Sequence, residues 1–241
     1  MNPGPRLAIE VDSKLFSILP EPLLQNFRLD IEPSSVVALV GPSGVGKSTL
    51  LRMIGGVDNV FSGRVLIDGR IAADSPPSGF VFQDPRLLPW LTAVENIRAV
   101  RTGTSEAEAL EMLMRVGLAG FEHYYPHELS GGMQRRVALA RACSVNPRLL
   151  LLDEPFVSLD RTLVGEMEQV LLTLIETNRP TVLLVTHRPE DAAALADRAV
   201  VLAGRPARII ADLCFPSPAG QRSRVEREQI AHQIAEATTT R

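Results

Sequence analysis

The sequence lacks the features that mark secreted, disulfide-stapled or membrane-spanning chains. It has only two cysteines, Cys143 and Cys214, and their separation fits neither a metal-ligand spacing nor a redox pair. A reducing cytosolic compartment is therefore the default expectation. The first residues, MNPGPRLAIEVD, contain no apolar core like that of a signal peptide. No apolar run approaches the roughly 18 residues needed to cross a bilayer, so a membrane role is expected to act through a partner.

An excess of positive charge is also missing. The 25 Lys and Arg residues are outnumbered by 28 Asp and Glu residues, for a net charge of −3. This balance disfavours binding of nucleic acid through bulk positive charge, although a local patch stays open. Aromatic residues make up 5% of the chain, and Trp90 is the only tryptophan. Hydrophobic residues, at 45% of 241, suffice for one large α/β domain or a core with a modest subdomain.

What the sequence does contain is a glycine-rich loop between an apolar, β-branched run at 36–40 and an apolar run at 50–54. An expected strand followed by an expected helix is the context in which G-x-x-x-x-G-K-[ST] predicts a cradle for a polyphosphate. An ordinary glycine turn is the alternative. The residues of the loop and of the helix start are Gly41, Pro42, Ser43, Gly44, Val45, Gly46, Lys47, Ser48 and Thr49.

The residue types of this loop suit phosphate chemistry. Its glycines let backbone N–H groups wrap an anion with no Cβ in the way, and the helix N-terminus adds partial positive charge. Lys47 is expected to reach the β- and γ-phosphates as a point charge. Ser48 is expected to place its hydroxyl on Mg²⁺.

Two acidic residues follow a second apolar run. Four leucines at 149–152 indicate a strand covered on both faces, and Asp153 and Glu154 come directly after them. Beside a phosphate loop, Asp153 would hold Mg²⁺ through water, and Glu154 would polarise the attacking water as general base. The alternative is that both acids cap the next turn.

Gln83 and His187 also follow apolar runs, at 80–82 and 181–186. If these runs are strands of a doubly wound sheet, both side chains lie at carboxyl ends, where such sheets bind ligands. His187 would then contact a γ-phosphate. A solvated glutamine and a structural histidine are the alternatives.

Residues 85–146 are expected to form a mostly helical insert, because Thr92 with Glu95 and Ser105 with Glu108 match the capping box of a helix start. At the chain start, short apolar runs within 7–31 predict strands of a small antiparallel sheet. Residues from 204 onward are expected to be a tail, with a linker at 216–224 and a short helix at 225–236 whose mixed charges favour a solvated face.

Two segments of the insert suggest contacts beyond the chain. Leu87–Leu91 is unusually apolar for a surface turn, and it predicts either a protein-docking patch with Trp90 as an anchor or a piece of the core. Ser130, Gly131 and Gly132 open a helix that is expected to run to about residue 144. That helix start is a second candidate anion-binding end, or an ordinary cap.

Together these motifs resemble the ATP-binding subunit of an ABC transporter, from about residue 7 to residue 204. The resemblance implies an α/β fold, with a P-loop NTPase (ABC ATPase) core, an N-terminal antiparallel β subdomain and an inserted helical subdomain at about 85–146. It implies that residues 1–215 form the ATP-binding domain and 216–241 a C-terminal tail. It also implies ATPase activity, with ATP and Mg²⁺ as cofactors.

The resemblance assigns roles to matching positions. It makes Lys47, Glu154 and His187 catalytic, and it places Mg²⁺ at Ser48, Gln83 and Asp153. Phe16 sits where the family carries an aromatic that stacks on adenine. Besides the loop residues at 41–49, the nucleotide-binding positions are Phe16, Gln83, Ser130, Gly131, Gly132 and Gln134 of the LSGGM-Q signature, and Asp160 of the Ser158-Leu159-Asp160 D-loop.

The segments 80–92, 94–97, 126–133 and 195–198 are similar to the nitrate/sulfonate/taurine importer subfamily. Two positions depart from the family pattern. Ser34-Ser35 replaces a Gly-Glu pair before the P-loop strand, with little effect expected because serine can still make the turn. Arg188 stands where an aspartate often follows the histidine, which puts the local switch geometry in question.

The resemblance further implies partners and a location. A second ATP-binding subunit, in the simplest case a homodimer, would complete each site by presenting Ser130–Gly132 to Gly41–Thr49. An integral permease would dock near Leu87–Leu91 on the cytoplasmic face of the plasma membrane, a periplasmic or lipoprotein solute-binding protein would act indirectly, and no nucleic acid would bind. The expected function is to power import of a small anion such as nitrate, a sulfonate or taurine. The alternatives are a transporter ATPase for a different solute, and a soluble ABC ATPase of DNA repair or translation, which the single cassette without sustained heptads disfavours.

Overall fold

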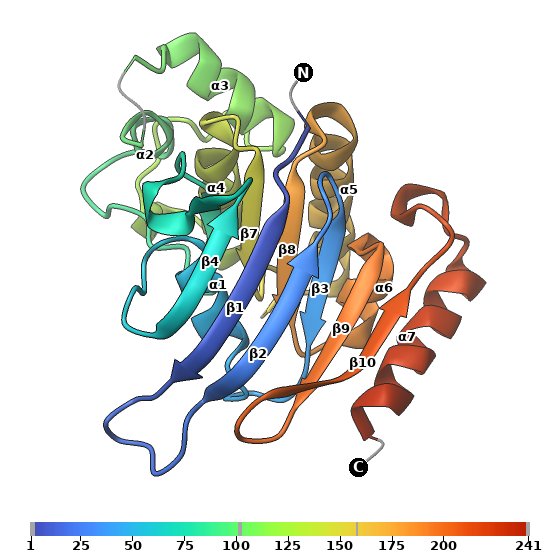
Figure 1. The fold of residues 1–241 in the computed structure, drawn as a ribbon. Helices are drawn as coiled ribbons and strands as arrows, with labels where there is room; N and C mark the ends of the chain where they lie inside the picture. Colours follow the sequence, from blue (N-terminus) through green and yellow to red (C-terminus); the bar gives the residue numbers. More distant parts are fainter. Residues whose placement is uncertain (1–2, 101–102, 158, 240–241) are drawn as a thin grey trace.

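The computed structural model describes residues 3–100, 103–157 and 159–239 and shows two β-sheets with helices packed between and beside them (Figure 1). Among these residues, the larger sheet has six strands in the order β10-β9-β3-β8-β7-β6, and the smaller sheet has four in the order β2-β1-β4-β5. The α/β architecture expected from the sequence is therefore present, and Ser158 of the expected D-loop lies outside the described residues.

The larger sheet is parallel except at one edge. Its strands are β3 (Val36–Val40), β6 (Gly79–Val81), β7 (Leu149–Asp153), β8 (Thr181–Thr186), β9 (Arg198–Ala203) and β10 (Arg208–Cys214). Only the β9–β10 pair is antiparallel among these described strands. Strands β3, β7 and β8 are buried along their whole length, which explains their unbroken apolar sequences. The parallel order brings the carboxyl ends of β3, β6, β7 and β8 to one edge of the sheet.

The smaller sheet is antiparallel, as the alternating pattern near the chain start predicts. Its strands are β1 (Leu7–Lys14), β2 (Leu24–Ile31), β4 (Ser62–Ile67) and β5 (Arg70–Ile71). Along the first half of β1 every second residue is buried, because one face of this sheet packs on the core that it shares with α1 and the larger sheet.

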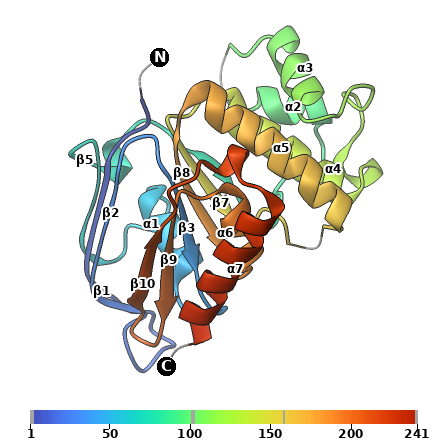
Figure 2. The ribbon, with the colours of Figure 1, turned by 90° about the vertical axis from the view of Figure 1, so that its right-hand side faces the viewer.

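The helices divide into three groups. Helix α1 (Lys47–Ile54) belongs to the hydrophobic cluster between the two sheets. Helices α2 (Ala93–Arg98), α3 (Glu106–Arg115) and α4 (Gly131–Ser144) share a separate cluster, and both expected capping boxes form there. Helices α5 (Arg161–Asn178), α6 (Pro189–Leu195) and α7 (Arg224–Thr239) cover the other face of the larger sheet (Figure 2). Short 3₁₀ turns lie at Ala72–Asp74, Pro126–Glu128 and Ala219–Gln221.

The end of the chain differs from the expectation of a tail after residue 204. Residues 208–214 form β10, which extends the larger sheet beside β9. Helix α7 lies along α6 and is not solvated all round, because Ile230 and Ile234 are buried against the core (Figure 2). Two isoleucines four residues apart occupy one helix face, but the charged residues around them obscure this short pattern in the sequence.

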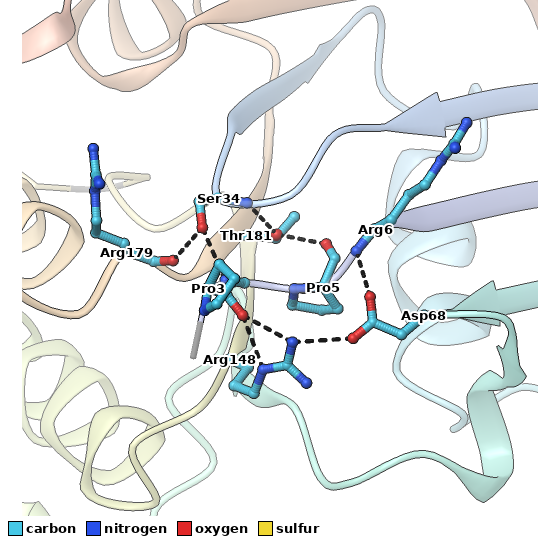
Figure 3. A network of polar contacts seen from close by, with 9 residues as sticks. Pro3, Pro5, Arg6, Ser34, Asp68, Arg148, Arg179 and Thr181 are labelled. Carbon is cyan, nitrogen blue, oxygen red and sulfur yellow. Dashed lines mark hydrogen bonds and ion pairs between the residues drawn. The ribbon is translucent and has the colours of Figure 1, made fainter. Parts of the chain in front are cut away.

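The Ser34-Ser35 departure takes part in a polar junction at the amino-terminal ends of the parallel strands (Figure 3). Ser34 has a backbone φ of 56°, in the left-handed region. Its hydroxyl donates to the carbonyl oxygen of Arg179 at 2.8 Å and accepts the Gly4 N–H at 2.8 Å. The Thr181 hydroxyl accepts the Ser34 N–H at 2.9 Å and donates to the Pro5 carbonyl at 2.6 Å. Serine therefore makes the turn and also ties the chain start to β8.

Arg148 extends this junction to the smaller sheet (Figure 3). Its Nη2 donates to the Pro3 carbonyl at 2.8 Å and to the Asp68 carboxylate at 3.0 Å. The other carboxylate oxygen of Asp68 accepts the Arg6 N–H at 2.9 Å. One guanidinium thus joins the start of β7, the chain start and the β4–β5 turn.

Candidate functional site

The glycine-rich loop follows β3 and ends where α1 begins at Lys47. A Cβ on Gly41 would lie 2.3 Å from the carbonyl oxygen of Leu202, so the close approach of loop and β9 requires glycine. Gly46 has φ +116°, a conformation that other residues rarely adopt. These two positions allow the loop to turn sharply and to aim its backbone at the N-terminus of α1.

Lys47 lies inside the loop. It is 5% exposed, and its ammonium donates to the carbonyl oxygens of Gly41 at 2.7 Å and Pro42 at 3.0 Å. Burial lowers the pKa of Lys47, and the charges of Glu154 and Asp153 oppose that shift. Neutral carbonyls are weaker partners for an ammonium than phosphate oxygens are, so this cation is available to an anion that enters the loop.

Ser48 and Asp153 meet although 105 positions separate them, because β3 and β7 both flank β8 in the sheet. The Ser48 hydroxyl donates to the Asp153 carboxylate at 2.7 Å. Burial raises the pKa of Asp153, and the hydrogen bond from Ser48 opposes the rise. A hydroxyl next to a carboxylate supplies the hard oxygen donors that Mg²⁺ prefers, so these two residues fit a magnesium ion.

Glu154 and His187 form the second pair. Parallel pairing places Asp153 opposite Val185, so the residues just past β7 and β8 emerge together. The Glu154 carboxylate and the His187 Nδ1 lie 2.6 Å apart. Glu154 also has φ 51°, a left-handed conformation that costs on the order of 1–2 kcal/mol for a residue with a side chain. Strain of this kind concentrates at functional positions.

Two adjoining cavities lie along this edge of the sheet. One of about 210 Å³ is lined by the glycine-rich loop together with Gln83 and Glu154. The other, of about 470 Å³, is lined by Ser48, Gln83 and Asp153 and by three arginines. Ser48 and Gln83 line both, so the expected phosphate and metal positions lie in neighbouring cavities. Gln83 lies just past the end of β6. The structure records no hydrogen bond between its side chain and Asp153 or Glu154.

Several residues of the site were not predicted from the sequence. Leu23 lines the smaller cavity, and its side chain lies 3.2 Å from where a Cβ on Gly46 would be. Arg205, in the β9–β10 turn, donates to the Gly44 carbonyl at 3.2 Å. The arginines of the larger cavity are Arg52, Arg86 and Arg135. No motif identifies these residues. Folding brings Leu23, Arg135 and Arg205 to the site from distant segments, whereas Arg52 lies four residues after Ser48 on α1 and Arg86 lies three residues after Gln83.

Other predicted residues lie outside both cavities in the described part of the chain. Ser130 caps α4 by accepting the Met133 N–H at 3.2 Å. Gln134 donates to the carbonyls of Pro126 and Leu129, and Asp160 caps α5.

Phe16, the expected adenine contact, also lines neither of these two cavities. It is half-buried, with the Lys14 ammonium 4.7 Å from the centre of its ring.

The loop of the site is tied to the helical insert. Arg141 of α4 donates to the carbonyls of Pro85 and Arg86, each at 2.8 Å, just beyond Gln83. Burial lowers the pKa of Arg141. Because α4 begins at the Ser130–Gly132 signature, this guanidinium connects that helix with the loop after β6.

The fold and this site define a P-loop NTPase. The family model described as "ABC transporter" matches residues 24–157. The chain belongs to the ABC transporter family and is an ATP-binding ATPase of that family, which confirms the resemblance found in the sequence.

Curated relatives and solved structures agree with this assignment. An "Aliphatic sulfonates import ATP-binding protein SsuB" of Bacillus cereus is 44% identical over 191 residues, covering 78% of this chain and 76% of that protein. An SsuB 2 protein of the same description from Pseudomonas syringae pv. tomato is 40% identical over 235 residues, covering 96% of each chain. The dimeric ATP-binding cassette MJ0796, bound to ADP and Pi, has a TM-score of 0.78 and 31% identity, covering 88% of this chain and 99% of that one.

Proposed function

We propose that this chain is the ATP-hydrolysing subunit of an importer for a small organic anion, an aliphatic sulfonate in the first instance. The observation that carries the proposal is the 40% identity to an aliphatic sulfonates import ATP-binding protein over 96% of both chains. The site supports it, because the phosphate loop, the metal-binding pair and the proposed general base line two neighbouring cavities that share Ser48 and Gln83.

Lys47, Ser48 and Asp153 are proposed to hold the nucleotide. Lys47 would exchange its two backbone carbonyls for β- and γ-phosphate oxygens, and the N–H groups at the start of α1 would bind the same anion. Ser48 and Asp153 would hold Mg²⁺ between them. When bound, the metal would neutralise charge on the phosphates.

Glu154 is proposed to orient and deprotonate the attacking water. The contact with His187 holds the Glu154 carboxylate in place beside the loop, so the side chain has few alternative conformations. His187 would contact the γ-phosphate from the neighbouring strand. Gln83 would move when the metal binds. Because Arg141 of α4 is hydrogen-bonded to the segment just after Gln83, that movement would reach the insert.

A second subunit is proposed to complete each site. The N-terminus of α4 lies outside both cavities of this chain. Around a Cβ built on Gly131 there is open space, so the described chain leaves this end accessible. The related cassette MJ0796 is dimeric. In a homodimer, Ser130–Gly132 of one subunit would face Gly41–Thr49 of the other.

The Leu87–Leu91 segment is proposed to dock on an integral permease. Trp90 is 69% exposed, which removes it from the core. The loop is held by Asn96, whose side chain accepts the Leu88 N–H at 2.8 Å and donates to the carbonyl of Leu91 at 3.0 Å. A rigid loop that displays a tryptophan suits an interface anchor.

No helix in the described ranges is long and apolar enough to span a membrane. We propose that the chain sits at the cytoplasmic face of the plasma membrane through the permease, with a solute-binding protein acting on the other side.

Uptake by the reconstituted importer tests this proposal. The permease that copurifies with the chain is placed in liposomes with its binding protein, and uptake of labelled ethanesulfonate, taurine and nitrate is measured with and without ATP. ATP-dependent uptake of the sulfonates that is lost with Glu154→Gln is expected. Uptake of nitrate alone would overturn the sulfonate assignment, and copurification with DNA or ribosomes in place of a permease would overturn the transport function.

A further inference from the structure

A second hollow lies at the opposite end of the parallel strands from the nucleotide site. It has a volume of about 600 Å³. Its apolar lining includes Ile67, Pro76, Pro77, Val145 and Leu149. Leu149 is the first residue of β7, whose last residue is Asp153. We call this hollow the rear cleft.

Three parts of the fold contribute walls to the rear cleft. Ile67 and Arg70 come from the smaller sheet, Val100 and Val145 from the insert, and Leu149 from the larger sheet. Volumes of this size, with apolar walls and a few polar groups, are typical of sites for small organic ligands.

The floor of the rear cleft is preorganised. Arg148, Asp68 and Pro5 line it, and they belong to the junction at the amino-terminal ends of the strands (Figure 3). Arg148 bonds to Asp68 at 3.0 Å and to the Pro3 carbonyl, so the floor is fixed by several hydrogen bonds. A ligand would not have to order these groups when it binds.

The charges of the rear cleft favour an anion. Its charged lining residues are Asp68, Arg70 and Arg148. Asp68 neutralises Arg148 through the contact at 3.0 Å. The side chain of Arg70 makes no recorded hydrogen bond or ion pair with any residue in 3–100, 103–157 or 159–239. One cation is therefore left to bind a ligand.

We propose that the rear cleft binds a small organic anion with an apolar chain, and that binding slows ATP turnover. Arg70 would hold the anionic group of the ligand. The apolar chain of the ligand would lie among the prolines, Ile67 and Leu149. A sulfonate or a carboxylate supplies the same chemistry.

The effect on turnover follows from where the walls lie. The main chain leaves the insert through Val145–Arg148 and enters β7. This crossing is tightly packed, because a Cβ on Gly79 would lie 2.7 Å from Pro147 and 2.8 Å from the Ala142 carbonyl. Val100 and Val145 belong to the insert and also line the cleft, so a movement of the insert relative to the smaller sheet changes the shape of the cleft. A ligand that binds this arrangement best shifts the population toward it.

Calorimetric titration of the whole chain, without ATP or permease, tests the site. The probes are hexane-1-sulfonate and hexanoate, with hexan-1-ol as the neutral chain and inorganic sulfate as the bare anion. Both six-carbon anions should bind more tightly than either control. Arg70→Ala should weaken them about tenfold, the scale of one charge-assisted hydrogen bond.

The matched control is Arg64→Ala, on the same sheet but outside the cleft and paired with Glu10; it should leave binding unchanged. Ser78→Phe, which fills the cleft, should abolish binding while the far-UV spectrum is retained. Equal binding of hexanol or unchanged affinity in Arg70→Ala would overturn the site. A preference for one anion over the other separates a sulfonate from a carboxylate source.

Turnover provides the second measurement. Hexane-1-sulfonate at saturation should slow ATP hydrolysis by the wild-type chain and have no effect on Arg70→Ala, whose activity without the probe should be normal. Binding without any change in turnover would overturn the regulatory part. Because the titration needs no transport, its failure would leave the importer proposal intact, and loss of uptake would leave the binding result intact.

Discussion

Replacing Glu154 by glutamine tests the proposed general base with little disturbance of the fold. The side chain is 11% exposed and contacts His187 at 2.6 Å. Glutamine has the same shape, so a hydrogen bond to the imidazole is kept while the basic oxygen is lost. Loss of a general base typically costs about 10²–10⁴-fold in rate, and kcat for ATP hydrolysis should fall by that factor.

The stability and ATP affinity of Glu154→Gln should change little. A destabilisation of 1 kcal/mol would lower the Tm of a chain of this size by roughly 2–4 °C, and we expect less because the contact is retained. The Glu154 charge raises the pKa of Lys47, so neutralising it lowers that pKa further. As the pH is raised, ATP binding by the variant should therefore weaken at a lower pH than binding by the wild type.

The assay compares steady-state hydrolysis, ATP binding at equilibrium and the size of the ATP-bound particle. Slowed hydrolysis should trap the variant as an ATP-bound dimer. Glu190→Gln is the control, because it removes a carboxylate three residues after His187 that lines neither cavity of the site. Normal turnover in Glu154→Gln would refute the assignment, and equal loss of turnover in Glu190→Gln would show that charge alone matters.

Four further predictions concern single contacts. Lys47→Ala should weaken ATP binding at least tenfold, because it removes the ammonium from the loop; unchanged affinity in a binding titration would refute the cradle. Trp90→Ala should leave basal ATPase normal and reduce copurification of the permease, and an intact complex would remove Trp90 from the interface. Arg141→Ala should lower stability by about 1–3 kcal/mol, since two hydrogen bonds from a charged donor are lost. It should also uncouple permease-stimulated from basal hydrolysis. Arg141→Lys should restore only part of the stability and of the coupling. Gly79→Ala should destabilise by about 1–3 kcal/mol because of overpacking, whereas Gly165→Ala, in the open interior of α5, should stabilise by roughly 0.5–1 kcal/mol; thermal melts showing the same sign for both would contradict this.

Local features of the structure were predictable because short-range rules govern them. The runs at 36–40, 149–152 and 181–186 are apolar on both faces, and all three are buried strands. Thr92 and Ser105 start helices because each has a glutamate three residues later. The glycine-rich loop lies between strand and helix as its motif requires.

The features that the sequence did not predict have a common cause. Residues 208–214 pair with β9 as an edge strand whose side chains are alternately exposed, so no apolar run marks it. Arg205 reaches Gly44 across 161 positions, and no local pattern records such a contact. Ser34 was expected only to make a turn, yet its hydroxyl bonds to residues that follow α5 and begin the chain.

By itself the sequence determined the chemistry available to this protein: a phosphate loop, two acids after one strand and a histidine after another. Only the tertiary structure decided which of these groups meet. Parallel register puts Glu154 beside His187, and strand order puts Ser48 beside Asp153. The same order leaves Ser130–Gly132 outside the cavities and forms the rear cleft at the other end of the strands. The physical reason is that motifs depend on local backbone geometry, whereas a site depends on contacts between strands far apart in the chain.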